Sequence, residues 1–341
     1  CEGGIARLPP AAANTVRGAV VIPSLARAAE ELTLNALDAG ANRIELFLHG
    51  GADCTVEVRD NGNGISRLNF TSLAEFGSSS KVSLGRHGPA PAEAEGLDGC
   101  SGPYGRRGEA LAALRSVAGH LVISSKAKAS GVRAGAAAEE GGSPRGDSSR
   151  TWCKEFRQNS LVHCGPAKCP RGPGTTILAE GLFEALPVRQ HGVDAAEQVL
   201  AARHCVERIS FMHPGVRFSL FELGAAARRE RLELLPEAST TARLAQVLGP
   251  QCASQLHEVS HRTAACRLEG AITLPHDFQA TDRFMFLFVN GRYVGDTPVH
   301  KLVSTLYTKC VEVLMGRSVQ GGGPGPLSIA AAGTGRAWPM F

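Results

Sequence analysis

The sequence predicts an α/β protein with two domains, and three observations support this class. The chain has 341 residues, while a single domain usually holds about 100–200. Hydrophobic residues make up 43 % of it, enough for a sizeable core, so global disorder is excluded. Stretches with helical spacing of apolar residues alternate with strand-like stretches. We expect a first domain over residues 1–190, a smaller second domain over 191–316 and a disordered tail over 317–341.

The first domain is expected to open with a helix over residues 16–40. Apolar residues recur there at helical spacing, Pro23 and Ser24 form a capping signal, and Gly40 stands where a C′ glycine belongs. The later elements follow from alternation and turn residues. They are strands over 43–48 and 55–59, a helix over 109–117, strands over 120–125, 151–156 and 175–179, and flexible insertions over 84–103 and 129–150.

The second domain is expected to begin with a helix over residues 194–212, which Pro214 ends. Its further elements follow from alternation, an apolar run and a turn signal. They are strands over 216–221, 267–273 and 284–289, a turn at Asn290-Gly291 and a helix over 300–314.

Charge, cysteine usage and hydropathy exclude several classes of protein. The net charge of +4 is mild, so it permits contact with nucleic acid without arguing for it. The ten cysteines include no C-x-x-C pair, which favours reduced intracellular thiols over a disulfide framework or a zinc site. No apolar run approaches about 18 residues, so we expect no membrane-spanning helix. The first residue is not Met, so we expect the chain to be a fragment.

Polar residues gather on the first helix and in the loop after the second strand. Glu31, Asn35 and Asp38 share one helical face, a pattern that is also typical of a solvated amphipathic helix. The loop reads Asp60-Asn61-Gly62-Asn63-Gly64. A carboxylate at a strand end with alternate glycines suits close approach of a backbone to a ligand, although the same residues are common in plain turns.

Two further stretches have the chemistry of phosphate binding. Residues 104–111 carry glycines and arginines into a helix start, where free N–H groups and the helix dipole favour anions. This stretch lacks the Gly-Lys-[Ser/Thr] ending of a P-loop, and it is also typical of an ordinary helix start with solvated arginines. Residues 78–81, Ser-Ser-Ser-Lys, join hydroxyls to a cation, which suits either phosphate or a plain polar loop.

Taken in order, four motifs resemble the N-terminal ATPase of the MutL family of mismatch-repair proteins. They are Glu31-Leu32-x-x-Asn35-Ala36-x-Asp38-Ala39, Asp60-x-Gly62-x-Gly64, Gly105-x-Arg107-Gly108-Glu109-Ala110-Leu111 and Gly174-Thr175. The wider GHKL group also holds gyrase B, the ninety-kilodalton heat-shock chaperone and histidine kinases. Within it, the third motif is specific to MutL. Strings such as Phe211-Met212-His213-Pro214 resemble the third eukaryotic MutL homologue, which is linked to meiotic crossing-over.

The resemblance covers about residues 15–310 and implies both a fold and a set of roles. The fold would be a two-layer sandwich, a mixed sheet with helices on one face, followed by a ribosomal-protein-like α/β domain that is incomplete at its C-terminus. Glu31 would be the general base of ATP hydrolysis, Asn35 would ligate Mg²⁺, and Asp60 would accept from the adenine amino group. The other implied nucleotide-site residues are Asp38, Ala39, Gly62, Gly64, Ser79, Ser80, Lys81, Gly105, Arg106, Arg107, Gly108, Glu109 and Thr175.

The resemblance also implies partners. Members of the family bind DNA without sequence preference, and arginines supply the candidates here, although each is also typical of a solvated basic face. They are Arg189, Arg203, Arg208 and Arg217, with Arg228, Arg229 and Arg231. An ATP-driven conformational switch in mismatch repair and meiotic recombination is implied. So are a second MutL homologue as heterodimer partner, MutS-type partners, a nuclear location and no membrane contact.

The sequence departs from the family in five places. Arg106 replaces an apolar residue, Ser79 conservatively replaces a threonine, and Gln190 replaces a basic residue. The lid segment carries the insertion 84–103, and the family's γ-phosphate lysine does not follow residue 315. No D-Q-H-A-x-x-E endonuclease motif is present. Three alternatives stay open: a nucleotide- and DNA-binding scaffold without significant turnover, another GHKL protein such as a topoisomerase subunit, and a degenerate gene product. We expect hydrolysis to be slow, as suits a switch. The sequence gives no hydrolysis rate and does not separate mismatch repair from meiotic crossover.

Overall fold

A computed structural model describes residues 9–51, 53–78, 104, 108–128, 150–186, 189, 194–224, 227–263, 266–274, 277 and 285–320. Those up to Ala238 form one compact unit, and those from Ser239 form a second. The insertions expected at 84–103 and 129–150 lie outside the described residues, apart from Arg150. The same holds for the expected tail beyond Gln320. In the described part of the chain, no helix is long and apolar enough to cross a membrane.

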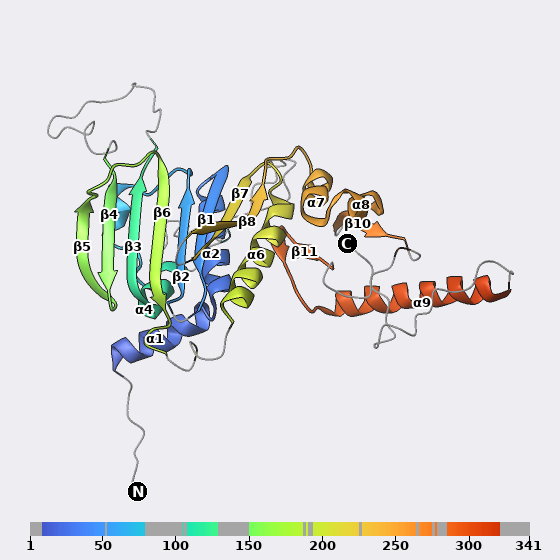
Figure 1. The fold of residues 1–341 in the computed structure, drawn as a ribbon, viewed down its shortest axis with the longest axis horizontal. Coiled ribbons are helices and arrows are strands. Elements are labelled where there is room, and N and C mark those ends of the chain that lie inside the picture. The colour runs from blue at the N-terminus through green and yellow to red at the C-terminus, as the bar shows by residue number, and fades with distance from the viewer. Residues whose placement is uncertain are drawn as a thin grey trace, which may run out of the picture. The chain divides into compact units, whose positions relative to one another are not determined.

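A mixed sheet forms one layer of the first unit, in the order β5-β4-β3-β6-β2-β1-β7-β8 (Figure 1). Neighbouring strands are antiparallel except β1 and β7, which are parallel. In chain order the strands are β1 (Arg43–His49), β2 (Thr55–Asp60), β3 (Ala118–Lys126), β4 (Trp152–Arg157), β5 (Ser160–Pro166), β6 (Gly174–Leu182), β7 (Arg217–Leu223) and β8 (Arg228–Leu234).

Helices form the second layer. They are α1 (Pro10–Val21), α2 (Leu25–Asp38), α3 (Arg67–Phe70), α4 (Ala110–Val117) and α6 (Ala195–Met212). In β1 the alternate residues Ile44, Leu46 and Leu48 are fully buried. On the opposite face Glu45 and His49 are half-exposed, while Phe47 is buried against the Phe221 ring and the guanidinium groups of Arg59 and Arg228. The described helices α2, α4 and α6 pack against this mixed sheet, which confirms the predicted α/β architecture.

The helix expected over 16–40 is two helices, because Pro23 interrupts the backbone hydrogen bonds. Ser24 then caps α2, its hydroxyl accepting from the backbone N of Arg27 at 3.2 Å. Gly40 has a φ of +70° and follows the C-cap Ala39, as predicted for a C′ glycine. The buried residues of α2 lie at helical spacing. They are Leu25, Ala28, Ala29, Leu32, Thr33 and Ala36.

The first unit runs past the boundary expected at 190/191 and ends at Ala238. The reason is β-sheet pairing: β7 lies parallel to β1 from Arg43 opposite Arg217 onward, and Phe218 and Leu220 are fully buried. Two strands of this sheet, β5 and β8, were not predicted from the sequence. β5 has exposed apolar residues, and β8 reads Arg-Arg-Glu-Arg-Leu-Glu-Leu, so neither shows a clean alternation.

The second unit combines helices with two small sheets. Its elements are α7 (Thr240–Leu248), α8 (Pro250–Ser254), β9 (Leu256–Arg262), β10 (Arg267–Thr273), β11 (Phe288–Val289), β12 (Arg292–Tyr293) and α9 (Pro298–Gln320). The buried strand expected over 284–289 is only two residues long, although Asn290-Gly291 does form the predicted turn with positive φ at both positions. Helix α9 continues to Gln320. The prediction of a disordered tail from residue 317 onward was therefore wrong for residues 317–320. Extending an existing helix needs no new nucleation.

Candidate functional site

The predicted polar face of α2 exists, and Glu31, Asn35 and Asp38 on it are all half-buried. Glu31 forms an ion pair with Arg27 one turn earlier. Asp38 Oδ1 accepts from the backbone N of Tyr104 at 2.8 Å. This face therefore has a carboxylate at each end and an amide between them, and its acidic groups already have protein partners.

Tyr104 also contacts the residue that follows α6. Its hydroxyl lies 2.9 Å from Nε2 of His213, and the two rings meet edge to face with centroids 5.7 Å apart. Burial lowers the pKa of His213 below its usual 6.5, against the opposing effect of Asp38. Tyr104 thus connects the end of α2 to the junction between α6 and β7.

Asp60 ends β2, beside the C-terminal end of α2. Its Oδ1 accepts from the backbone N of Gly62 at 2.8 Å and of Thr175 at 3.2 Å. Among the described residues, both hydrogen bonds to this carboxyl end on Oδ1, which leaves Oδ2 for a donor on a ligand. Burial raises the pKa of Asp60, while these two N–H groups and the Arg171 guanidinium lower it.

The two glycines of the loop are required for different reasons. A Cβ on Gly62 would lie 2.8 Å from the carbonyl oxygen of Ala39, so the loop and the end of α2 are in backbone contact. Gly64 has a φ of +70°, and a Cβ there would lie 2.1 Å from the carbonyl oxygen of Lys126. Gly64 therefore packs on the end of β3, whereas Gly62 lies beside the Asp60 carboxyl.

A buried hydroxyl pair supports this corner of the sheet. Thr175 Oγ1 lies 3.0 Å from Ser125 Oγ. Ser125 also donates to the carbonyl oxygen of Gly174 at 2.9 Å and accepts from the backbone N of Ile65 at 2.8 Å. The hydroxyls thus connect β3, β6 and the glycine loop, which holds the Thr175 N–H near Asp60.

The predicted phosphate-binding stretch 104–111 is described at Tyr104 and from Gly108 onward. Gly108 has a φ of +62°, and Glu109 precedes α4. The Glu109 carboxylate accepts from Arg17 of α1 at 2.6 Å, and the same guanidinium lies 4.4 Å from the Phe76 ring centroid. Arg17 thus contacts residues on both sides of the stretch 79–107, since Phe76 precedes it and Glu109 follows it. The predicted phosphate residues Ser79, Ser80, Lys81, Gly105, Arg106 and Arg107 lie outside the described residues.

Asn35 has the chemistry expected of a magnesium ligand. Mg²⁺ prefers oxygen donors and usually keeps several waters, with one or two protein ligands besides substrate phosphates. A single half-buried amide on the α2 face fits such a site. In the described part of the chain, no three His, Cys, Asp or Glu side chains gather into a metal cluster.

Six of the seven candidate DNA-binding arginines, all except Arg229, have local contacts in the described part of the chain. Arg189 donates to the carbonyl oxygens of Ala19 and Pro23 at 2.9 and 3.1 Å. Others pair with carboxylates, such as Arg203 with Glu207 at 2.8 Å. The remaining partners are Cys205 for Arg208, Glu233 for Arg217, Glu222 for Arg231 and the Phe221 ring for Arg228. The charges of Arg203, Arg217 and Arg231 are therefore partly offset within the first unit.

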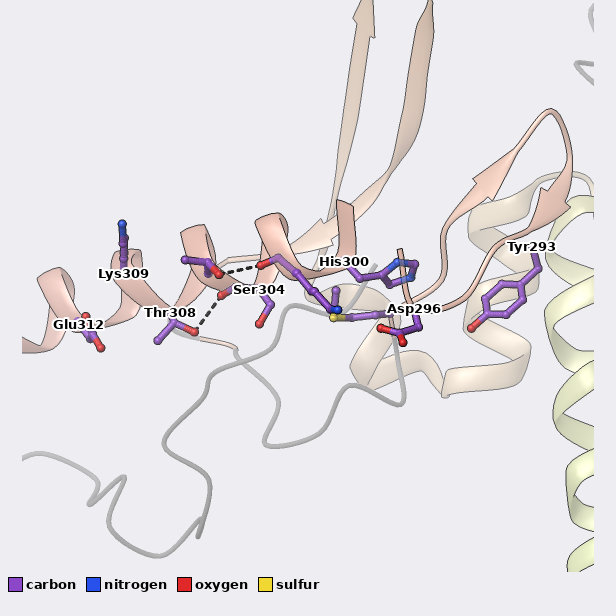
Figure 2. Close-up of a pocket in the computed structure, with 10 residues that line it drawn as sticks. Tyr293, Asp296, His300, Ser304, Thr308, Lys309 and Glu312 are labelled. Carbon is purple, nitrogen blue, oxygen red and sulfur yellow. Dashed lines mark hydrogen bonds between the residues drawn. The ribbon is translucent and has the colours of Figure 1, made fainter. Parts of the chain in front are cut away.

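A separate hollow of about 720 Å³ lies along α9 in the second unit (Figure 2). Hydroxyls line much of it, and two of them are used within the helix, since Thr305 donates to the carbonyl oxygen of Lys301 and Thr308 to that of Ser304. None of the residues predicted to bind nucleotide lies there.

Sequence reasoning overlooked several residues that shape the site. Arg27, Ser125 and Arg171 touch or support the predicted ligand-binding residues, as does Arg17. Of these four residues, only the contact of Arg27 could have been predicted from the sequence, because Arg27 stands four positions before Glu31 on the same helix. The other contacts join segments far apart in the chain, which no local pattern reveals.

Comparisons with known proteins agree with this geometry. Residues 23–136 match the family of histidine kinase-, DNA gyrase B- and HSP90-like ATPases, and residues 244–315 match the C-terminal domain of DNA mismatch repair protein. MutL of Phenylobacterium zucineum (strain HLK1) is 31 % identical over 295 residues, which are 86 % of this chain and 44 % of that protein. The chain therefore spans less than half the length of this relative.

Solved structures show the same fold. The N-terminal domain of a DNA repair protein aligns with a TM-score of 0.66 and 22 % identity, over 87 % of this chain and 82 % of that one. The Aquifex aeolicus MutL ATPase domain complexed with ADP aligns with a TM-score of 0.57 and 17 % identity, over 84 % and 89 %.

A mixed sheet with helices on one face, an acidic and amide face on α2 and a carboxylate at the end of β2 together define a GHKL-type ATPase domain. This domain is followed by a second unit that matches the mismatch-repair C-terminal family. The chain belongs to the MutL family of DNA mismatch-repair proteins.

Proposed function

We propose that this chain binds ATP between α2 and the end of β2 and works as a nucleotide-dependent conformational switch. The observation that carries the proposal is the Asp60 carboxylate, which is held through Oδ1 by the N–H groups of Gly62 and Thr175. A carboxylate fixed in this way presents Oδ2 to the amino group of adenine, and it repels a base that has a carbonyl there.

Hydrolysis is assigned to the α2 face. Glu31 is the general base that takes a proton from the attacking water, and Asn35 is one turn further along the same face. Asn35 would hold Mg²⁺, which would neutralise part of the negative charge of the nucleotide phosphates. The reaction products are ADP and inorganic phosphate, and turnover is slow because the protein is a switch.

One pair of variants tests this assignment. Glu31→Ala should reduce ATP turnover by about 100-fold or more, the usual contribution of a general base, while nucleotide affinity changes little. Glu30→Ala is the matched control, because Glu30 also accepts from Arg27, at 2.7 Å. Equal turnover in the Glu31→Ala protein and the wild type would refute the assignment.

The finer role follows from the family resemblance. The chain would belong to a nuclear protein similar to the third eukaryotic MutL homologue. It would act in mismatch repair and meiotic recombination with a second MutL homologue and MutS-type partners. DNA binding would use the arginines Arg189, Arg203, Arg208 and Arg217, with Arg228, Arg229 and Arg231. Binding that falls steeply with salt and is indifferent to sequence would support this role, and its absence at low salt would refute it.

A scaffold without significant turnover is the second candidate, and one observation favours it. The Glu31 carboxylate is paired with Arg27 in this structure, so the general base is engaged before any substrate arrives. The Glu31→Ala comparison separates the two candidates, because only a catalytic carboxylate changes turnover.

A further inference from the structure

Arg171 lies in the loop before β6 and joins three strands of the sheet at its ligand-binding corner. Its Nη2 donates to the carbonyl oxygen of Asp60 at 2.8 Å, and its Nη1 donates to that of Ser124 at 3.1 Å. Its backbone N donates to Oγ1 of Thr151 at 3.0 Å. Arg171 therefore connects the ends of β2 and β3 to the start of β4.

This contact replaces strand pairing where the pairing stops. β2 and β6 pair only as far as Arg59 opposite Thr176, one residue before Asp60. Beyond that point the backbone of Gly174 lies directly against Asp60, since a Cβ on Gly174 would be 2.1 Å from the Asp60 carbonyl oxygen. The guanidinium supplies a hydrogen bond that the β2–β6 pairing no longer provides, at the residue whose carboxylate meets the ligand.

The guanidinium also affects the charge of that carboxylate. Burial raises the pKa of Asp60, and Arg171 is one of two cations that lower it, the other being Lys128 beyond β3. The neighbouring end of α2 presents Ala39, which is uncharged. Burial lowers the pKa of Arg171 itself, and Asp60 opposes that effect, so the two groups favour each other's charged forms.

We propose that Arg171 is the positioning residue of Asp60: it fixes the backbone of Asp60 beyond the end of the strand pairing and supplies positive charge beside its carboxylate. Arg171 would thereby determine specificity for a base with an amino group over one with a carbonyl. A protonated Asp60 donates to a carbonyl and loses the discrimination, while an ionised Asp60 keeps it. This inference rests on the proposed nucleotide-binding function.

The test measures dissociation constants of a non-hydrolysable ATP analogue and its GTP counterpart, with Mg²⁺, from about pH 5 to pH 8. Arg171→Met should weaken binding of the ATP analogue by about 10-fold near neutral pH, the effect of one lost charge-assisted hydrogen bond. Its affinity should also begin to fall at a higher pH than that of the wild type, and the preference for ATP over GTP should shrink. Arg157→Met is the matched control, because Arg157 pairs with Glu155 on β4, away from Asp60.

Two further variants make the outcome decisive. Arg171→Lys keeps the charge but cannot reach both carbonyl oxygens, so it should weaken binding with a smaller change in the pH profile; it carries the test if Arg171→Met does not fold. In an Asp60→Asn background, Arg171→Met should no longer alter the pH profile. If the wild type binds and both Arg171 variants show its affinity, pH profile and base preference, the inference alone is wrong. If the wild type binds no nucleotide at any pH, the proposed function fails as well.

Discussion

Arg27 forms an ion pair with Glu31 one turn further along α2, and its guanidinium also donates to Glu30 at 2.7 Å. The Glu31 side chain is only 18 % exposed, while that of Arg27 is 42 % exposed. The proposed general base is therefore held by a cation from its own helix. Because a cation bound to a carboxylate reduces its ability to take a proton, this pair should restrain hydrolysis.

Replacing Arg27 should release that restraint. We expect Arg27→Gln to raise the turnover number several-fold, by up to about 10-fold, with little change in nucleotide affinity, because the carboxylate becomes a stronger base. Steady-state ATP hydrolysis measures this. Arg267→Gln, which removes a surface pair with Glu269 in the second unit, is the control. A fall in turnover would show instead that Arg27 orients Glu31 for the reaction.

The Asp60 carboxylate should reduce the stability of the free protein. Burial raises its pKa above the usual 3.8, so the unfolded chain releases this proton more readily than the folded one. The protonated Asp60 carboxyl therefore adds to the free energy of unfolding below pH 3.8, and this stabilisation is lost as pH rises through the pKa of the folded protein. Asp60→Asn should therefore be more stable than the wild type near neutral pH, with a difference that shrinks toward about pH 4. Urea unfolding across pH checks this, with Asp53→Asn as control.

Gly64 and Gly77 offer a matched pair for backbone packing. Both have positive φ, +70° and +80°, but a Cβ would strike Lys126 only at Gly64 and would have nothing within 4 Å at Gly77. Alanine at either position has the left-handed penalty of about 1 kcal/mol. Gly64→Ala should lower the free energy of unfolding by about 1–3 kcal/mol more than Gly77→Ala does, because the loop must shift to make room for the Cβ. Equal losses in free energy of unfolding would mean that the loop moves without resistance.

His213 should make the first unit sensitive to mild acid. Its pKa is lowered by burial, so the unfolded chain binds a proton at about pH 6.5 before the folded chain does. Stability is then lost as pH falls below 6.5 toward the folded pKa. His213→Gln should flatten this part of the profile while keeping a partner for Tyr104. The exposed His163→Gln should leave the profile unchanged, and a flat wild-type profile would contradict the account.

The sequence predicted those parts of the fold that depend on local patterns. The cap at Ser24, the C′ glycine at Gly40 and the turn at Asn290-Gly291 follow from residue chemistry within a few positions. The boundary at 190/191 was misplaced because β7 pairs with β1, more than 160 residues earlier (residue 217 opposite residue 43). Such pairing leaves no mark in the local sequence.

The site shows the same division. Glu31, Asn35 and Asp38 share a face because one helix carries them, so spacing alone predicts it. The positions of Thr175 and Arg171 beside Asp60 depend on how β2, β3 and β6 end together, which only the assembled sheet determines. Gly64 belongs to the Asp60-x-Gly62-x-Gly64 motif, yet its contact is with Lys126 of β3, and neither the motif nor its spacing indicates that neighbour.

Thermal unfolding with and without a non-hydrolysable ATP analogue and Mg²⁺ shows whether Asp60 forms part of a nucleotide site. Ligand at about 100 times its dissociation constant should add roughly 2.7 kcal/mol to the free energy of unfolding. We expect a clear rise in the melting temperature of the wild type and of Glu31→Ala, and little or none in that of Asp60→Asn. No shift in the wild type at millimolar analogue, or an equal shift in Asp60→Asn, would contradict a nucleotide site built on Asp60.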